Sequence, residues 1–124
     1  MTERCSPSPA ASAKLSAESA QRAITTVLFD LDGTLADTAP DMGFALNEVL
    51  REHGQSPLPL TELRPYTSHG SLGLIRHAFG FGAEHARFQA IRQRFLDIYQ
   101  THLMVDTRLF PGVEELLERL ERTG

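Results

Sequence analysis

Only one stretch of this sequence has the profile of a buried β-strand, and this limits the folds that the chain can adopt. Residues 24–29, ITTVLF, form a short β-branched and aromatic run without turn residues, as buried strands do. A lone strand leaves its backbone N–H and C=O groups without partners. The predicted strand therefore needs neighbouring strands, which the rest of the sequence does not predict.

Hydrophobic side chains recur at helical spacing in four later segments. Pro40 suits the first turn of the first helix, and Gly54 ends it. Residues 55–63, QSPLPLTEL, predict only a proline-punctuated connection. The expected helices cover residues 38–53, 68–82, 84–103 and 113–122. Their apolar faces comprise Met42, Leu46, Val49, Leu50, Leu72, Ile75, Phe79, Phe88, Ile91, Phe95, Ile98, Val113, Leu116, Leu117 and Leu120.

One strand, a helical block and a returning helix do not complete a domain. Residues 24–35 and 110–124 are typical of the opening of an α/β layer, and the helical block between them is typical of a subdomain. Because the other strands of such a layer are missing from the sequence, we expect the chain to be a fragment. Residues 1–23 are rich in Ala and Ser and poor in large apolar side chains, which predicts a disordered extension.

The overall composition narrows the class of protein. With 41% hydrophobic and 23% charged residues, the 124-residue chain is typical of soluble globular proteins. A net charge of −4 gives no sign of a nucleic-acid or membrane-surface partner, and no apolar run approaches the roughly 20 residues that cross a bilayer. The single cysteine, Cys5, is compatible with the cytoplasm, where we expect the protein. The oligomeric state stays open.

Two carboxylates stand two residues apart where the predicted strand ends. Asp30 and Asp32 are followed at once by Gly33 and Thr34, and alternation along a strand sends both carboxylates to one side. Such a pair repels unless a cation lies between its members. Mg²⁺ fits, because it takes one or two carboxylates together with water and phosphate oxygens.

These residue types suit phosphoryl transfer. One carboxylate can attack phosphorus to form an aspartyl-phosphate, and the other can protonate the leaving oxygen and later deprotonate a water. Gly33 allows a sharp turn beside the phosphate, and the Thr34 hydroxyl can hold it. The predicted ligand is therefore a small phosphorylated metabolite.

The run FDLDGTLADT, residues 29–38, resembles the first motif of the haloacid dehalogenase superfamily. The resemblance implies a Rossmann-like α/β core, incomplete here, with an inserted α-helical cap. It implies the first core strand and catalytic loop at residues 24–37, the cap at 38–106 and the return to the core at 107–124. LFPGVEELLERL at residues 109–120 resembles the family's return from cap to core.

The resemblance also implies roles for individual residues. Asp30 is the expected nucleophile and a Mg²⁺ ligand, and Asp32 is the expected general acid/base, which also binds the metal through its backbone carbonyl. Members that cleave carbon–halogen or phosphonate bonds lack an acid at the second position, so Asp32 favours phosphate esters. The sequence is most similar to phosphoglycolate phosphatases and to relatives that act on sugar phosphates.

Three elements of the family pattern find no counterpart in the sequence. These are a Ser or Thr after the second core strand, a Lys or Arg that binds phosphate, and the late acids of the Mg²⁺ shell. The only lysine, Lys14, lies in the predicted extension. We therefore expect the 124-residue chain alone to be inactive, because the transferring phosphoryl group lacks electrostatic stabilisation.

A second candidate segment lies in the expected cap. Ser68, His69 and Gly70 stand at the amino end of the helix predicted at residues 68–82, whose N-terminal amides can bind an anion. In the resembling phosphatases a cap segment at this place closes over the active site, which makes the three residues candidate substrate contacts. The alternative is an ordinary turn in which Ser68 or Ser71 caps the helix. Arg64 and Arg76 are further candidates for a substrate carboxylate, although arginines usually occupy solvated faces.

Several functions stay open at this point. Phosphoglycolate is the leading substrate, N-acetylmuramic acid 6-phosphate or another sugar phosphate is the second, and a sugar-phosphate mutase is a further enzymatic alternative. A non-catalytic binding fragment that pairs with another chain is the alternative from a different class. The five histidines show no compact metal-ligand spacing. Asp37 and Asp41 are expected to favour the amino end of the first cap helix, with an outer-shell contact to the metal as the alternative for Asp37.

Overall fold

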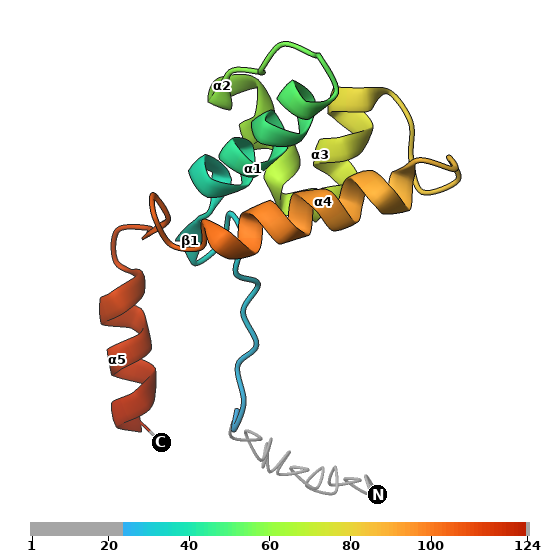
Figure 1. Ribbon diagram of the computed structural model, residues 1–124. Helices are drawn as coiled ribbons and strands as arrows, with labels where there is room; N and C mark the ends of the chain where they lie inside the picture. Colours follow the sequence, from blue (N-terminus) through green and yellow to red (C-terminus); the bar gives the residue numbers. More distant parts are fainter. Residues whose placement is uncertain (1–23, 124) are drawn as a thin grey trace, which may run out of the picture.

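The structure, a computed structural model, describes residues 24–123 (Figure 1). The extension predicted for residues 1–23 lies outside this range. The helices are α1 (Ala39–Glu52), α2 (Leu60–Leu63), the 3₁₀ helix η1 (Arg64–His69), α3 (Gly70–Phe79), α4 (Phe88–Thr101) and α5 (Val113–Thr123). The strands are β1 (Ala36–Asp37) and β2 (Arg108–Leu109).

Helix α1 confirms the first predicted helix. Thr38 is its N-cap and Pro40 lies in its first turn, where a missing N–H is harmless. The helix ends at Glu52, and Gly54 follows with a φ of +70°. The predicted apolar face is buried, with Met42, Leu46, Val49 and Leu50 at most 3% exposed.

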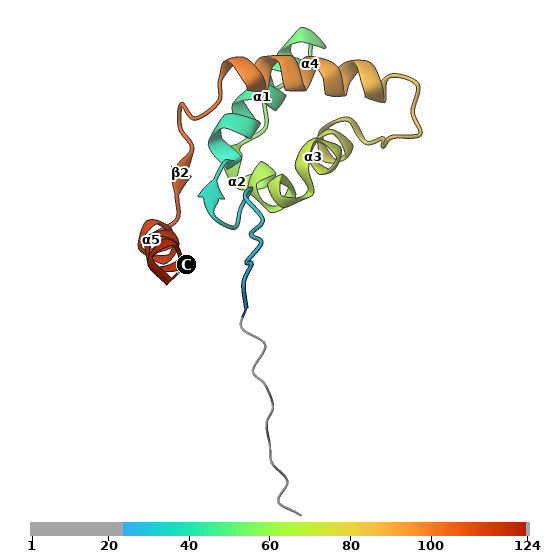
Figure 2. The same ribbon diagram turned by 90° about the horizontal axis from the view of Figure 1, so that it is seen from below.

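Helices α1 to α4 and η1 form one compact helical unit around a shared core (Figures 1 and 2). We call this unit the cap, after the segment that the sequence predicts. Helix α1 packs against α4, and α3 packs against η1 and α4. Helix α4 begins at Phe88, four residues after the expected start. The fully buried large side chains are Leu46, Val49, Leu50, Leu63, Leu74, Ile75 and Phe95, which at about 1.5–3 kcal/mol each make this core the main source of stability.

Two predictions within the cap need correction. The connection expected at residues 55–63 contains α2, whose Leu63 is fully buried and so adds a contact that favours local helix. Leu72 was assigned to the core but is 46% exposed, and Leu74 is buried in its place. Ile75 is buried as predicted, so the buried face of α3 differs from the predicted one by the exchange of Leu72 for Leu74.

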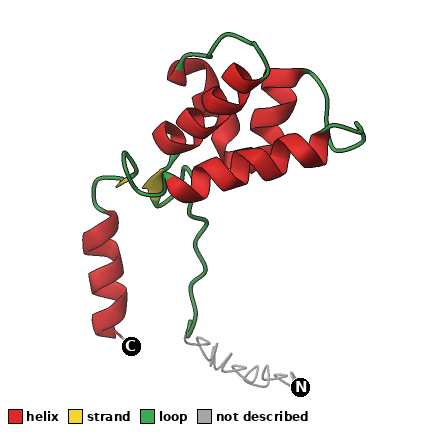
Figure 3. Cartoon of the chain, viewed as in Figure 1, coloured by secondary structure: helices red, strands yellow, loops and turns green. Residues whose placement is uncertain are grey.

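The buried strand predicted at residues 24–29 is wrong for this structure. The segment is irregular and exposed, with Leu28 91% and Val27 50% accessible, and no strand of the described residues pairs with it. The physical reason is the one that makes a lone strand unstable, because its backbone groups have no partners. Helix α5 likewise leaves Leu116 and Leu117 about two-fifths exposed, and it lies apart from the cap (Figure 3).

A two-stranded sheet joins the two points where the chain enters and leaves the cap. Strands β1 and β2 are antiparallel, with Ala36 opposite Leu109 and Asp37 opposite Arg108. The Phe110 N–H donates to the Leu35 carbonyl at 3.0 Å and extends the pairing. Neither strand was predicted, since each has only two residues.

Candidate active site

The loop that carries Asp30 and Asp32 is a tight turn held by its own backbone. The N–H groups of Thr34, Leu35 and Ala36 lie 3.0–3.2 Å from the Leu31 carbonyl, and the Gly33 N–H donates to the Ala36 carbonyl at 2.8 Å. Gly33 has a φ of +75°, a conformation that side-chain-bearing residues adopt at an energetic cost. The predicted turn at Gly33 is present.

The two carboxylates of this loop are available to a ligand. Asp30 is exposed and Asp32 half-buried. The Thr34 hydroxyl donates to Asp30 Oδ2 at 3.3 Å, which leaves most of the oxygen lone pairs of Asp30 free. The structure thus brings Asp30, Gly33 and Thr34 together in one exposed turn.

Helix η1 of the cap lies against this loop at two points. A Cβ atom built on Gly33 would lie 3.9 Å from Ser68 Cβ, so the predicted turn and the predicted cap segment are neighbours. An Arg64 guanidinium N–H donates to Asp37 Oδ1 at 2.6 Å. Asp37 is therefore engaged in an ion pair, while Thr38 holds the N-cap position of α1.

The Ser68–Gly70 segment ends η1 and begins α3. Ser68 and His69 are exposed, and Gly70 has a φ of +62°. Among the described residues no side chain caps the amino end of α3, and the Ser71 hydroxyl instead accepts a hydrogen bond from Arg92 at 3.1 Å. The alternative reading, in which Ser68 or Ser71 caps the helix, therefore does not hold.

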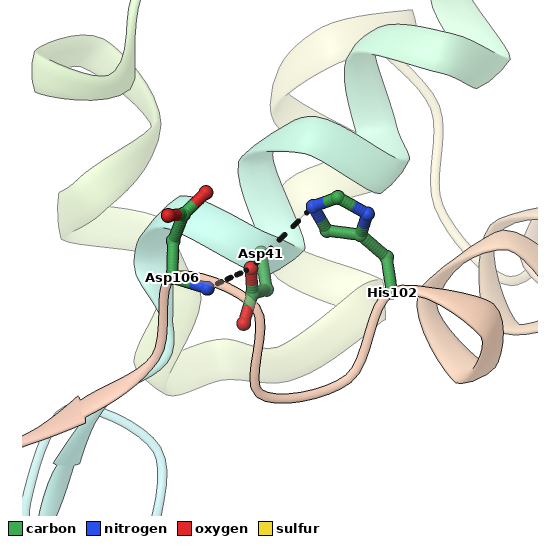
Figure 4. A group of neighbouring side chains, drawn as sticks. All are labelled: Asp41, His102 and Asp106. Atoms are coloured by element: carbon green, nitrogen blue, oxygen red, sulfur yellow. Dashed lines mark hydrogen bonds and ion pairs between the residues drawn. The ribbon is translucent and has the colours of Figure 1, made fainter.

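Asp41 forms a contact that the sequence did not predict. Its side chain is fully buried at the base of the cap. Asp41 Oδ1 accepts the Asp106 N–H at 2.9 Å, and Oδ2 accepts the Thr107 N–H at 3.0 Å and the Thr107 hydroxyl at 2.7 Å. Asp41 thus joins the start of α1 to residues 106–107, and Figure 4 shows its side chain between Asp106 and His102. We call this group, Asp41 with Asp106 and Thr107, the cap latch.

The electrostatics of Asp41 favour its ionised form. Burial acts to raise the pKa of Asp41, but hydrogen bonds from Thr107 and Asp106 and the nearby His102 together outweigh it and leave the pKa lowered. His102 Nε2 lies 3.7 Å from Asp41 Oδ1, and its ring stacks on Phe44 with centroids 3.9 Å apart.

Asp41, His102 and Asp106 could be taken for a metal site, because ligand atoms of the three lie within 4.8 Å of one another. Asp106, however, binds Asp41 through its backbone N–H rather than through its carboxylate (Figure 4). Three hydrogen bonds already occupy the Asp41 oxygens. We therefore interpret the group as a structural latch.

The donor set of the Asp30–Asp32 turn fits Mg²⁺. Two accessible carboxylates on one turn supply the ligands that this ion takes from a protein when water and phosphate complete its shell. Within residues 24–123, Asp30 and Asp32 form no group of three convergent ligands with another acid, His or Cys. A metal held here would neutralise the pair and polarise a phosphate oxygen.

Comparison with known proteins identifies the relatives of the chain. A family model described as haloacid dehalogenase-like hydrolase matches residues 27–124. The phosphoglycolate phosphatase of Xanthomonas campestris pv. campestris is 45% identical over 98 residues, 79% of this chain and 44% of the relative. The N-acetylmuramic acid 6-phosphate phosphatase of Pseudomonas aeruginosa is 39% identical over 102 residues, 82% of this chain and 45% of the relative.

The chain spans less than half the length of the curated relatives that it matches. No solved structure gives a significant match. Among the described residues, no helix has the length and apolar character needed to cross a bilayer.

Proposed function

Because the chain belongs to the haloacid dehalogenase-like hydrolases, we propose that it carries the phosphoryl-transfer loop and cap of a Mg²⁺-dependent phosphatase. The observation that supports this most is the Asp30–Asp32 turn, exposed to ligand and lying against the cap at Ser68. The α/β fold of the family is represented here by the cap and by the segments that lead into and out of it. The proposed setting is the cytoplasm, where phosphorylated metabolites occur.

In the proposed reaction, Asp30 attacks phosphorus while the ester P–O bond breaks, and Asp32 gives a proton to the leaving oxygen. Asp32 then takes a proton from water, which attacks the aspartyl-phosphate and releases inorganic phosphate and free Asp30. When Mg²⁺ is bound, the Asp30 carboxylate and the Asp32 backbone carbonyl would hold it. The short side chain of Thr34 and the open backbone at Gly33 would contact the phosphoryl group.

Ser68, His69 and Gly70 are the proposed substrate contacts from the cap. Their support is position, because Ser68 is the cap residue that lies beside Gly33. The exposed side chains of Ser68 and His69 could hydrogen-bond the part of the substrate that leaves with the ester oxygen. Arg64 is a weaker candidate for a substrate carboxylate, since its guanidinium already pairs with Asp37.

Phosphoglycolate is the proposed substrate, and N-acetylmuramic acid 6-phosphate is the second candidate. Relatives named for each activity match nearly the same share of the chain, at 45% and 39% identity. A sugar-phosphate mutase shares the same pair of acids, and product analysis would distinguish it. A non-catalytic piece that pairs with another chain would instead show a stable hetero-complex without turnover.

We further propose that residues 1–124 alone do not turn over substrate. Among the described residues, the one side-chain hydrogen bond to Asp30 or Asp32 comes from the Thr34 hydroxyl, and no Arg, Lys or His forms an ion pair with either acid. Stabilisation of the transferring phosphoryl charge by such groups is the largest part of catalysis in this class of reaction.

A chimera tests the proposal directly. Residues 24–124 would replace the matching part of the Xanthomonas phosphoglycolate phosphatase, and phosphate release would be measured with phosphoglycolate and with N-acetylmuramic acid 6-phosphate, with and without Mg²⁺. We expect Mg²⁺-dependent release with one of these esters, lost by at least a factor of about 10³ in Asp30→Asn, as for removal of a covalent nucleophile.

Two controls make the result specific. Asp97→Asn changes an exposed acid on α4 and should leave the rate within about twofold. The 124-residue chain should release no phosphate above its Asp30→Asn variant. A folded chimera that hydrolyses neither ester, or whose Asp30→Asn variant stays active, would refute the assignment.

A further inference from the structure

A cavity lies in the cap, between η1 and α3. Its volume is about 450 Å³, and it is lined by Tyr66, His69, Leu72, Gly73, Arg76 and His77. This lies within the range of about 300–1,000 Å³ found for small-molecule sites. Of these side chains only His69 is among the proposed substrate contacts, and none takes part in the hydrogen bonds of the Asp30 turn. The rest of the cavity needs its own explanation.

The walls of this cap cavity are preformed. The rings of Tyr66 and His77 stack with centroids 4.1 Å apart and planes 15° apart, and His77 Nε2 lies 2.9 Å from Glu62 Oε1, which fixes its orientation. A Cβ atom at Gly73 would lie 2.4 Å from His69 Cβ, so only glycine lets η1 and α3 approach this closely. A ligand would therefore meet rigid rings at little entropic cost.

The charge of the lining is one-sided. Its ionisable side chains are Tyr66, Arg76 and two histidines, and it contains no carboxylate, although the chain has sixteen acids against twelve Lys and Arg. Glu62 pairs with His77 from outside this lining.

Arg64 pairs with Asp37 and Arg94 with Glu52, and Arg92 donates to the Ser71 hydroxyl. Arg87 resembles Arg76 in forming no ion pair among the described residues, but it does not line the cavity. Within residues 24–123, the Arg76 guanidinium takes part in none of the side-chain hydrogen bonds or ion pairs, although the Arg76 carbonyl accepts the Gly80 N–H.

Glu84 does not neutralise this arginine. The Arg76 charge contributes to a lowered pKa of Glu84, but bonds from backbone N–H groups, including its own, are the main cause. Glu84 Oε1 accepts the Gly82 N–H at 2.9 Å. The Arg76 guanidinium thus keeps its donors available, and its planar fork matches a carboxylate.

We propose that the cap cavity binds a small organic anion, in which a carboxylate pairs with Arg76 and a flat apolar body packs on Tyr66 and Leu72. The ring faces and Leu72 form an apolar surface that inorganic phosphate cannot use, while the basic lining disfavours cations. A ligand here touches His69, the neighbour of Ser68, and so contacts the same 3₁₀ helix that lies against the Asp30 turn.

The test is binding of 2-naphthoate to the 124-residue chain, followed by amide chemical shifts. We expect saturable shifts centred on His69, Gly73 and Arg76. The neutral analogue 2-naphthalenemethanol should bind at least about tenfold more weakly, and inorganic phosphate should not produce these shifts. Arg76→Gln should lower the affinity for naphthoate about tenfold, and Arg119→Gln, an exposed arginine on α5, should leave it unchanged.

Several results would overturn the proposal. Equal binding of the neutral analogue would remove the role of the carboxylate, and equal loss in Arg119→Gln would indicate non-specific charge. Shifts with phosphate alone would indicate a simple anion contact. If Arg76→Gln fails to fold, Arg76→Lys keeps the charge without the planar fork and should weaken binding, and unchanged affinity there would contradict the proposed pairing. Because turnover is not measured, the outcome is independent of the proposed phosphatase activity.

Discussion

The cap latch and the Asp30–Asp32 turn place carboxylates in opposite surroundings within about ten residues of sequence. Asp41 is fully buried, and three donors at 2.7–3.0 Å occupy its oxygens. Asp30 is exposed and receives one bond of 3.3 Å. A buried carboxylate whose oxygens all accept hydrogen bonds stabilises the fold. Carboxylates whose oxygens have few partners can instead bind a ligand.

The largest effect on stability is expected from Asp41→Asn. The amide places an NH₂ group against backbone N–H donors that need an acceptor, so we expect a loss of about 3 kcal/mol in the free energy of unfolding. Urea unfolding of the chain measures it. Asp106→Asn is the matched control, because Asp106 joins the latch through its backbone N–H, and its loss should stay below about 0.5 kcal/mol.

The latch should also make stability depend on pH in a predictable direction. The pKa of Asp41 is lowered in the folded protein from its ordinary value of 3.8, so the unfolded state binds a proton first as the pH falls. The stabilisation is complete above the unfolded pKa and is lost as the pH falls from about 4 through the folded pKa. Urea midpoints between pH 7 and pH 3 should fall less in Asp41→Asn, and identical slopes would contradict this role.

An intermediate effect is expected at the turn itself. Gly33→Ala forces a side chain into the left-handed conformation at φ +75°, which should cost about 1 kcal/mol. Gly33→Asn should lose less, since asparagine tolerates this conformation better. Equal losses in the two variants, by urea unfolding, would mean that contact with Ser68 rather than backbone strain decides the result.

The smallest effect on stability is expected for the two proposed catalytic acids, Asp30 and Asp32. Asp30→Asn and Asp32→Asn should each change the free energy of unfolding by less than about 0.5 kcal/mol. The reason is that Asp30 is exposed and Asp32 is only half-buried. Mild stabilisation at low salt is expected, since one of two like charges is removed. A loss as large as that of Asp41→Asn would end the distinction between the two regions.

What could be predicted from the sequence was local in the chain. The buried face of α1 followed from helical periodicity and the Thr38–Pro40 start, and the turn at Gly33 followed from residue type. The latch could not be found this way, because its partners lie 65 residues apart and Asp41 looks like an ordinary first-turn acid. One signal did exist. The predicted cap begins at residue 38 and ends at residue 106, and this places Asp41 and Asp106 near the two ends of the same segment.

Periodicity failed where burial depends on partners outside the segment. Residues 24–29 have the composition of a buried strand but gain no backbone partner among the described residues. The predicted apolar face of α5 is only partly covered, with Val113 buried and Leu117 38% exposed. A pattern states which side of an element prefers an apolar neighbour, and tertiary contacts decide whether one is there.

The register of β1 and β2 makes the cap a separable module. Asp37 lies opposite Arg108, so the chain departs and returns at a single point, and everything between could be replaced by a two-residue Asn–Gly turn that closes a hairpin. Helical insertions of other lengths could be exchanged at the same point without rerouting the flanking chain. Such a junction lets evolution, or an engineer, change the helices that lie against the Asp30–Asp32 turn while leaving the turn itself untouched.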